Sequence, residues 1–384
     1  MTLTQNADRL LTEATASHAI PGVVAMATTA DETIYQGSFG KASLAGDAKM
    51  ALDTVFHIAS MTKAITGAGA MQLVEQGRVG LDTPAGEIIA QLGEPQVLDG
   101  FDTTSAPKLR PARGTITMRN LLTHTAGYAY DVWNPELARF YKVTGLPAAR
   151  TGRLEALKAP LASDPGTRWE YGINIDWVGR IVEELSGLNL NDYLRANVFD
   201  PLGMRDSGFL LRPDQEPRRV PTHARGADGG LTPQPIDPPH VPEFFNGGGG
   251  LYSTARDYLA FLRAILNGGG GVLKPETVAL MGQNHIGALN VQPMLSQNKE
   301  SSYDVDLFPG MAVKWGLTFL INTQDVPGRR TAGSLAWAGL RNTYYWIDPA
   351  KRVGGVFMTQ VLPFADPTVL RVFADFEREV YASL

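Results

Sequence analysis

Cysteine is absent from this chain of 384 residues. Its absence excludes disulfides, zinc sites built from thiolates and a cysteine nucleophile. Histidine is scarce, with six residues, and no two of them have a metal-ligand spacing such as His-Glu-x-x-His. The sequence therefore gives no indication of a metal or of another cofactor.

Long apolar runs and stretches of one charge are missing as well. No run approaches the ~18 apolar residues of a membrane-spanning helix, and the N-terminus lacks the basic and apolar regions of a signal peptide. The 34 basic and 39 acidic residues are mixed, without the basic stripe that binds nucleic acid. We expect a cytoplasmic protein with no membrane or nucleic-acid partner; the sequence indicates no oligomeric state.

The composition that remains, with 44% hydrophobic residues, is that of a globular protein with a sizeable core. Strand-like runs lie near both ends of the chain, as a hairpin over residues 20–43 and as several β-rich runs after residue 313. From about residue 80 to 250, helical patterns alternate with long Gly/Pro loops. This order indicates an α/β domain assembled from both ends of the chain, with an α-helical insertion.

Helical periodicity is clear at several places in the chain. It predicts a helix over residues 7–18 and an amphipathic helix that ends before Gly187. The run Asn-Gly-Gly-Gly-Gly occurs at 246–250 and again at 267–271. Neither copy joins a strand to a Gly-Lys-Ser/Thr helix start, so we expect flexible turns rather than phosphate loops.

A serine placed three residues before a lysine is a spacing that some acyl-transferring enzymes use for a nucleophile and its base. The chain contains it four times, as Ser38/Lys41, Ser60/Lys63, Ser105/Lys108 and Ser296/Lys299. In three pairs a glycine, a proline or a polar stretch without periodicity interrupts the helix that would bring the two side chains together. Only Ser60 opens a strong helical pattern, which continues to Gly77.

At a helix start, Ser60 would lie near unpaired N–H groups that favour an oxyanion. Lys63 would lie on the same face of an apolar helix, and burial lowers the pKa of an ammonium from ~10.4. A neutral Lys63 would then accept the Ser60 proton. The alternative is that Ser60 only caps the helix and that Lys63 is a solvated charge.

Longer segments surround and follow this pair: FHIASMTKAITGAGAMQLVEQGRVGLDTP, ITMRNLLTHTAGY, PGTRWEYGINIDWVGRIVEELSG and SLAWAGLRNTYYWIDP. In this order, over about residues 20–380, they resemble the motifs of the serine β-lactamase and penicillin-binding-protein superfamily, on its class C side. Within it, the chain looks most like the family VIII carboxylesterases and is similar to the fungal statin-side-chain acyltransferases.

The resemblance implies a β-lactamase-like α/β (α+β) fold, with an antiparallel sheet flanked by helices and a second, mostly α-helical domain. Residues 1–65 and 251–384 would form the sheet domain, and residues 66–250 the helical domain. The active site would lie at their interface.

The resemblance also implies catalytic roles. Ser60 would be the nucleophile, Lys63 its proton partner and Tyr171 the second-motif tyrosine, while the backbone N–H groups of Ser60 and Leu340 would form the oxyanion hole. From the residues alone, Tyr171 follows a turn-rich loop that would present its phenol to a cleft, where a lysine lowers a phenol pKa of ~10. The alternative is an aromatic side chain that anchors the loop.

The chain departs from the β-lactamase pattern at two motifs. The second motif has Ile173 where β-lactamases have asparagine, with Asn174 one place later, and the third motif reads Trp337-Ala338-Gly339 in place of Lys-Thr/Ser-Gly. The cation and hydroxyl that would bind a substrate carboxylate are thus missing, so we expect a neutral or apolar acyl group. The resemblance supports this choice, because family VIII esterases share the Trp-x-Gly variant.

Aromatic residues are frequent in the loops expected to line the cleft. The predicted substrate-binding residues are Trp337, Ala338, Gly339, Ile173, Tyr128, Tyr130, Trp133 and Phe245. The alternative is that most of the aromatic ones pack loops against the core. His124 would suit a Ser-His-Asp site, but the chain has no Gly-x-Ser-x-Gly elbow, so we expect His124 to hydrogen-bond loop backbone.

We therefore predict a serine hydrolase, a carboxylesterase of the family VIII type, that acts on a small-molecule ester through a covalent acyl-enzyme and hydrolyses β-lactams weakly. Two alternatives stay open. An acyltransferase would move the acyl group from a thioester or ester to an alcohol. A catalytically silent penicillin-binding-like scaffold would bind a partner without turnover.

Overall fold

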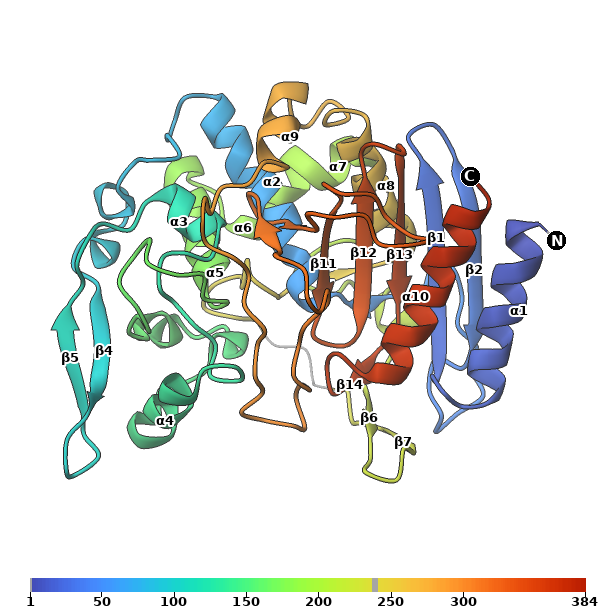
Figure 1. Cartoon of the computed structure of the whole chain (residues 1–384), viewed down its shortest axis with the longest axis horizontal. Helices are drawn as coiled ribbons and strands as arrows, with labels where there is room; N and C mark the ends of the chain where they lie inside the picture. The colour runs from blue at the N-terminus through green and yellow to red at the C-terminus, as the bar shows by residue number, and fades with distance from the viewer. Residues whose placement is uncertain (1, 237–240) are drawn as a thin grey trace.

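The computed structural model describes residues 2–236 and 241–384. Within these residues the central sheet has seven antiparallel strands in the order β2-β1-β13-β12-β11-β10-β9. Its strands are β1 (Gly22–Thr29), β2 (Thr33–Gly40), β9 (Lys314–Trp315), β10 (Leu320–Ile321), β11 (Leu335–Gly339), β12 (Thr343–Asp348) and β13 (Val353–Met358). Figure 1 shows strands from the two ends of the chain, blue and red, side by side in this sheet. The predicted antiparallel sheet is confirmed.

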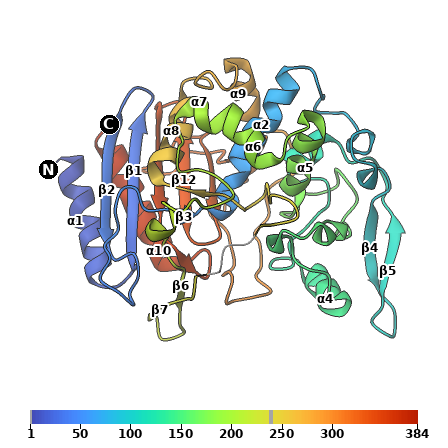
Figure 2. The same cartoon turned by 180° about the vertical axis from the view of Figure 1, so that it is seen from behind.

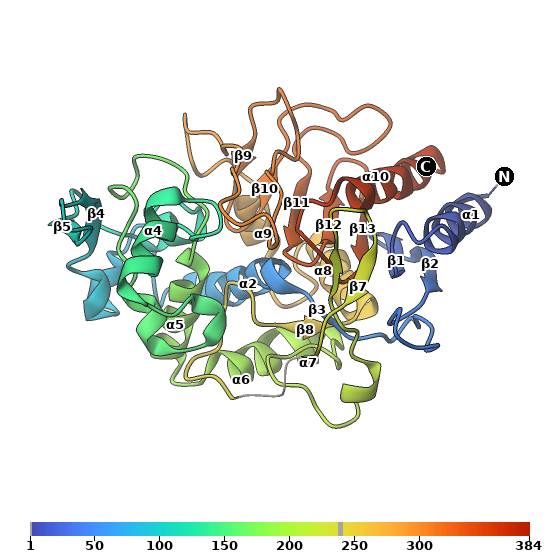
Figure 3. The same cartoon turned by 90° about the horizontal axis from the view of Figure 1, so that it is seen from below.

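Helices cover both faces of the sheet. The terminal helices α1 (Leu3–Ala16) and α10 (Pro367–Ala382) pack against each other on one face, and α8 (Ala255–Leu266) packs on β1, β12 and β13 from the other (Figure 3). α1 begins before the predicted residue 7 because Thr2 and Gln5 form a reciprocal capping box. Sequence periodicity does not detect such a polar first turn.

The rest of the chain includes the part of the molecule that lies opposite the terminal helices α1 and α10 in Figure 1. Its helices are α2 (Thr62–Glu75), α3 (Met118–Leu122), α4 (Pro135–Thr144), α5 (Asn174–Ser186), α6 (Leu190–Leu194), α7 (Asp200–Leu202) and α9 (Pro275–Met281). α5 ends as predicted, because Gly187 takes the left-handed conformation with φ 75°. The boundaries between the two predicted domains stay a prediction.

Among the described residues, seven short strands lie outside the central sheet, and four of them, within residues 96–233, fall in the region where the sequence predicts only helices and loops. The seven strands are β3 (Phe56–His57) with β8 (Tyr252–Ser253), β4 (Gln96–Phe101) with β5 (Pro107–Pro111), and β6 (His223–Arg225) with β7 (Leu231–Pro233) and β14 (Val361–Leu362). These strands have two to six residues each, too few for a clear alternation of apolar and polar side chains.

Helix α2 is the element that positions the site. It contacts α5 and α6 and is visible between them and the sheet in the view from behind (Figure 2). Its residues from Thr62 to Leu73 are buried on every side, so α2 is a central helix rather than an amphipathic one. Any polar side chain on it must find its partners inside the protein. Among the described helices, none is long and apolar enough to cross a bilayer.

Candidate active site

Ser60 and Lys63 meet at the N-terminal end of α2. Ser60 lies in a 3-10 turn (Ala59–Met61) that runs directly into α2, and Ala59 before it has a left-handed backbone with φ 44°. The Thr62 hydroxyl donates to the Ala59 carbonyl at 2.6 Å and so stabilises this unusual turn. Lys63 Nζ lies 3.1 Å from Ser60 Oγ. The predicted pair is therefore within proton-transfer distance.

The Lys63 amine is fully buried, at 0% exposure. It donates to the Gly248 carbonyl at 2.6 Å and lies 3.2 Å from the Tyr130 hydroxyl. Burial lowers the pKa of Lys63 to about 7, and the Asp176 carboxylate opposes that fall. A substantial fraction of the amine is thus neutral near pH 7, as the sequence predicts for a base. The alternative of a solvated Lys63 is wrong.

Tyr171 stands on the other side of Ser60. Its phenol, 4% exposed, accepts a hydrogen bond from Trp337 Nε1 at 2.8 Å and is hydrogen-bonded to the Ser60 side chain. Its ring also lies under Lys63 Nζ, 4.6 Å from the ring centroid. The Ser60, Lys63 and Tyr171 side chains therefore form one connected group, and an indole holds the phenol in place.

The pKa of Tyr171 differs from the sequence expectation. Burial raises this pKa well above the ordinary value of a phenol, and the hydrogen bonds from Ser60 and Trp337 oppose the rise only in part. The expectation that the pKa of Tyr171 falls is therefore wrong, because desolvation outweighs the hydrogen bonds that lower it. A neutral phenol at Tyr171 is suited to donating or relaying a proton, and the Lys63 amine is the better candidate for the base.

The third motif brings β11 against the nucleophile. β11 ends at Gly339, and a Cβ there would lie 2.3 Å from the Ile58 carbonyl oxygen and 2.2 Å from Thr343 Oγ1. This close approach requires glycine. Leu340 follows directly and is half-buried. Among the turn, loop and cap hydrogen bonds of the described residues, none has the backbone N–H of Ser60 or Leu340 as its donor; the oxyanion hole made by these two groups stays a prediction.

Substituting Gly339→Ala is expected to push β11 away from Ile58 and to lower kcat for ester cleavage by about 10²-fold, the usual effect of losing one oxyanion donor. The measurement is the initial rate on p-nitrophenyl butyrate. Gly46→Ala is the matched control, because a Cβ at Gly46 meets nothing within 4 Å. Equal rates for Gly339→Ala and the control would contradict this role of the β11 end.

His124 and Asn174 form a second polar pair behind Tyr171. Asn174 Nδ2 lies 2.9 Å from His124 Nδ1, and the His124 ring contacts Tyr171 with centroids 4.8 Å apart. Burial, and then the Lys63 charge, lower the pKa of His124, so this ring is neutral. His124 therefore bonds to a side chain rather than to loop backbone as predicted. Asn174 faces this histidine and not Lys63, in keeping with its shifted place in the motif.

The predicted substrate-binding residues divide into several groups. Ile173 and Tyr128 are buried in the core, at 1% and 4% exposure. Trp133 is half-buried, and its indole donates to Ser302 Oγ at 3.1 Å while its ring contacts Tyr171. Phe245 packs on Phe209 and lines a separate surface pocket.

Tyr130, predicted only as a pocket residue, instead contacts the catalytic amine. Of the third motif, Trp337, Ala338 and Gly339 are all buried. Trp337 is the member of the predicted set that lines the cavity next to the site.

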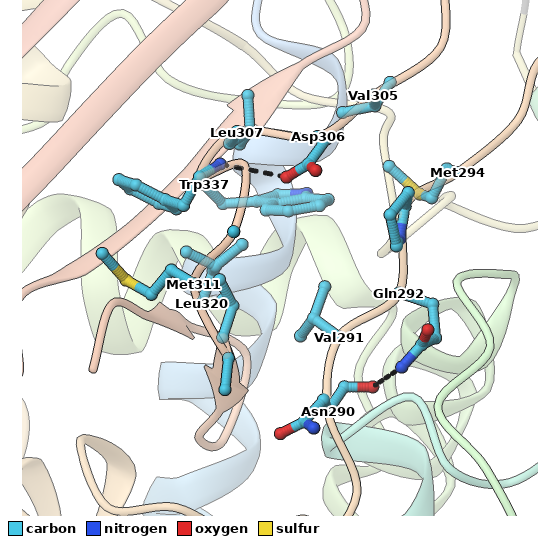
Figure 4. Close-up of a pocket in the computed structure, with 15 residues that line it drawn as sticks. Asn290, Val291, Gln292, Met294, Val305, Asp306, Leu307, Met311, Leu320 and Trp337 are labelled. Atoms are coloured by element: carbon cyan, nitrogen blue, oxygen red, sulfur yellow. Dashed lines mark hydrogen bonds between the residues drawn. The ribbon is translucent and has the colours of Figure 1, made fainter. Parts of the chain in front are cut away.

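That cavity has a volume of about 230 Å³. Figure 4 shows that Val291, Met294, Met311, Leu320 and Trp337 surround it. Most of its wall comes from the chain segments 290–294 and 305–313. These segments carry no motif and little periodicity, so their sequence does not indicate that they line a cavity. The side chain of Asp306 is exposed and belongs to the same lining. Asn290 and Gln292 also line the cavity, so its wall is partly polar, but the described lining contains no lysine or arginine. A wall without a cation and with a carboxylate in it disfavours an anionic ligand.

Among the described residues, no group of three or more histidine, aspartate or glutamate side chains is arranged to hold a metal ion. The side chains that meet at Ser60 offer a hydroxyl, an amine and a buried phenol.

The fold and this site define the β-lactamase-like serine hydrolase superfamily. A family model described as Beta-lactamase matches residues 7–377, and the chain belongs to this family. The resemblance predicted from the sequence is confirmed.

Several named proteins are similar to this chain. Monacolin J acid methylbutanoyltransferase of Aspergillus terreus is 33% identical over 387 residues, covering 96% of this chain and 94% of that protein. Lovastatin esterase of Penicillium rubens is 32% identical and covers 94% of each chain. The unliganded selenomethionyl structure of simvastatin synthase from Aspergillus terreus has a TM-score of 0.87 at 32% identity, covering 98% of this chain and 97% of that one.

Proposed function

We propose that the protein cleaves neutral carboxylic esters through a covalent acyl-enzyme on Ser60. The observation that carries this proposal is the buried Lys63 amine, 3.1 Å from Ser60 Oγ, whose pKa burial lowers to about 7. Such an amine is a general base matched to neutral pH. The β-lactamase family and the two named activities among the relatives, an acyl transfer and an ester cleavage, support the same class of chemistry.

The reaction proceeds in two halves. Ser60 Oγ attacks the ester carbonyl carbon while its proton passes to Lys63 Nζ, and the carbonyl electron pair moves onto oxygen, facing the N–H groups of Ser60 and Leu340. When the tetrahedral intermediate breaks down, the leaving alkoxide takes a proton relayed from Lys63 through Tyr171. Water then gives a proton to Lys63 while its oxygen attacks the acyl carbon. When this second intermediate breaks down, the bond between the acyl carbon and Ser60 Oγ breaks, Lys63 returns the proton to Ser60 Oγ, and the acid leaves.

The substrate is proposed to be a small neutral ester. The indole of Trp337 stands where the superfamily has a lysine, and the adjoining cavity has methionine and aliphatic walls beside the Asp306 carboxylate. A substrate carboxylate would be desolvated there without a cationic partner, which is costly. The same argument predicts that β-lactams, which carry a carboxylate, are hydrolysed only weakly.

Acyl transfer to an alcohol is the second candidate. It keeps the same acyl-enzyme and replaces the attacking water by a bound alcohol. The observation that favours it is the 33% identity over 96% of the chain with a protein named as a methylbutanoyltransferase. An esterase with 32% identity favours hydrolysis, so the two outcomes differ in the acceptor and not in the nucleophile.

The fate of the acyl group distinguishes hydrolysis from transfer. The protein is incubated with a butyryl ester or thioester and increasing concentrations of an alcohol, and the free acid and the new ester are quantified. We expect free acid to be the major product at every alcohol concentration. A large excess of the new ester would replace the hydrolase assignment by that of an acyltransferase. A protein that releases neither product and forms no acyl-enzyme would be the silent scaffold.

A further inference from the structure

A buried carboxylate without full hydrogen bonding lies in the first turn of α5. Asp176 is 0% exposed, and its Oδ1 accepts one hydrogen bond, from the Gly248 N–H at 2.9 Å. Its Oδ2 has no hydrogen-bond partner among the described residues. A buried carboxylate left in this state costs stability. Packing alone therefore does not explain why a carboxylate occupies this position.

Gly248 connects this carboxylate to the catalytic amine. Its N–H donates to Asp176, and its carbonyl accepts from Lys63 Nζ at 2.6 Å. The neighbouring Gly247 carbonyl accepts from Thr66 Oγ1 at 2.8 Å, so α2 and α5 hold this segment between them. A Cβ at Gly248 would lie 2.8 Å from Asp176 Oδ2, which explains the glycine. Thus Gly247 and Gly248, expected to belong to a flexible turn, form part of the site.

Asp176 is also the anion that acts on Lys63. Ser60 from the 3-10 turn, Tyr130 and His124 from the segments after α3, and Tyr171 before α5 also face Lys63. These groups are neutral, since burial raises the phenol pKa values and lowers that of His124.

The titratable groups that face Asp176 are Lys63, Tyr130, Tyr171 and Tyr141. Burial raises the pKa values of the three tyrosines and the Asp176 carboxylate adds to the rise, whereas for Lys63 the carboxylate opposes the fall that burial causes. Burial raises the pKa of Asp176 itself to about 6, with Lys63 opposing the rise. An ionised Asp176 and a protonated Lys63 therefore stabilise each other.

We propose that Asp176 is a positioning residue, which holds the Lys63 amine against Ser60 through Gly248 and stabilises the ammonium that forms when Ser60 gives up its proton. This role rests on the proposed function of Ser60 as nucleophile. In the step concerned, the Ser60 O–H bond breaks, the proton binds to Lys63 Nζ, and Ser60 Oγ forms its bond to the acyl carbon. The new positive charge then has a buried negative partner.

Asp176→Asn removes the negative charge of this side chain, while the asparagine amide oxygen still accepts the hydrogen bond from the Gly248 N–H. A carboxylate favours protonated Lys63, so its removal lowers the pKa of Lys63 further. The acidic limb of the pH–rate profile should move to lower pH by about one unit or more, in the range of a single nearby charge. The plateau rate should fall about tenfold, because a weaker base accepts the Ser60 proton less readily. The rate measured is fluorophosphonate labelling of Ser60, which needs no natural substrate.

Asp257→Asn is the matched control. Asp257 is the third residue of α8 as Asp176 is of α5, and it is also buried, at 6% exposure. Asp257→Asn removes a structural aspartate, so it should lower the melting temperature and the plateau rate of labelling without moving the acidic limb of the pH–rate profile. An acidic limb left in place by Asp176→Asn would overturn the proposal. A wild-type protein that never labels at Ser60 would instead overturn the proposed function.

A second measurement uses the wild-type protein and so does not depend on the folding of a variant. In a carbon-13 NMR titration, the Lys63 signal, assigned by its loss in Lys63→Met, reports proton uptake, and the buried aspartyl carboxyl signal reports the charge of Asp176. The proposal requires an ionised carboxylate while Lys63 takes up its proton. A carboxyl group that stays protonated throughout this range would contradict it.

Discussion

Ser60→Ala is expected to abolish ester cleavage, with a loss on the order of 10⁴-fold or more in kcat, as for other nucleophile knock-outs. The hydroxyl oxygen is the atom that would carry the acyl group; Lys63 Nζ donates a hydrogen bond to it at 3.1 Å, and the same hydroxyl is hydrogen-bonded to Tyr171. Because alanine removes one oxygen atom from a half-buried position, the fold should be retained. The measurements are the rate on p-nitrophenyl butyrate and mass spectrometry after fluorophosphonate labelling.

The chain supplies its own control for this substitution. Ser38 precedes Lys41 by the same spacing, but it lies on strand β2, and Lys41 forms an ion pair with Asp47 at 3.0 Å instead. Ser38→Ala should retain the wild-type rate and the label at position 60. Equal rates for Ser60→Ala and the wild type would favour a silent scaffold, and an adduct on any other residue would remove Ser60 from the mechanism.

The contact between Ser60 and Lys63 was predictable because the 3-10 turn that contains Ser60 runs directly into α2. A spacing of three residues fixes which side chains share a face, and the apolar residues after Ser60 indicate that this face is buried. The fold class followed from longer motifs whose order along the chain matches the superfamily. These are local or sequential signals, which a single sequence carries.

The rest of the site depends on contacts between distant segments. Asp176 and Gly248 are 72 residues apart, and nothing in either local pattern indicates that they meet behind Lys63. The cavity wall comes from segments 290–294 and 305–313, which are shaped by their packing on β10 and β11 and not by a motif. The sign of the Tyr171 pKa shift also needed the structure, because burial and neighbouring groups act in opposite directions.

Lys63→Met is the second substitution with a large expected effect. Methionine is similar in length and suits a site with 0% exposure, but it has no lone pair that accepts the Ser60 proton. We expect kcat to fall by about 10³-fold, within the range for loss of a general base. In the wild type, activity should decline as the pH falls through about 7, the pKa to which burial lowers Lys63, because the protonated amine cannot act as a base. This limb should be absent from the residual activity of Lys63→Met.

A loss of rate in Lys63→Met has a second explanation, since the change also leaves the Gly248 carbonyl and Asp176 without their partner. Lys63→Ala distinguishes the loss of proton transfer from the loss of these contacts, because the space that it opens admits a small primary amine from solution. Restoration of the rate by ethylamine, rising with pH as the free amine forms, would identify proton transfer as the lost function. Lys41→Met, the change at another lysine that follows a serine by three residues, should leave the rate as in the wild type. A Lys63→Met protein that keeps its full rate would show that Ser60 is activated without this amine, and the mechanism would need another base.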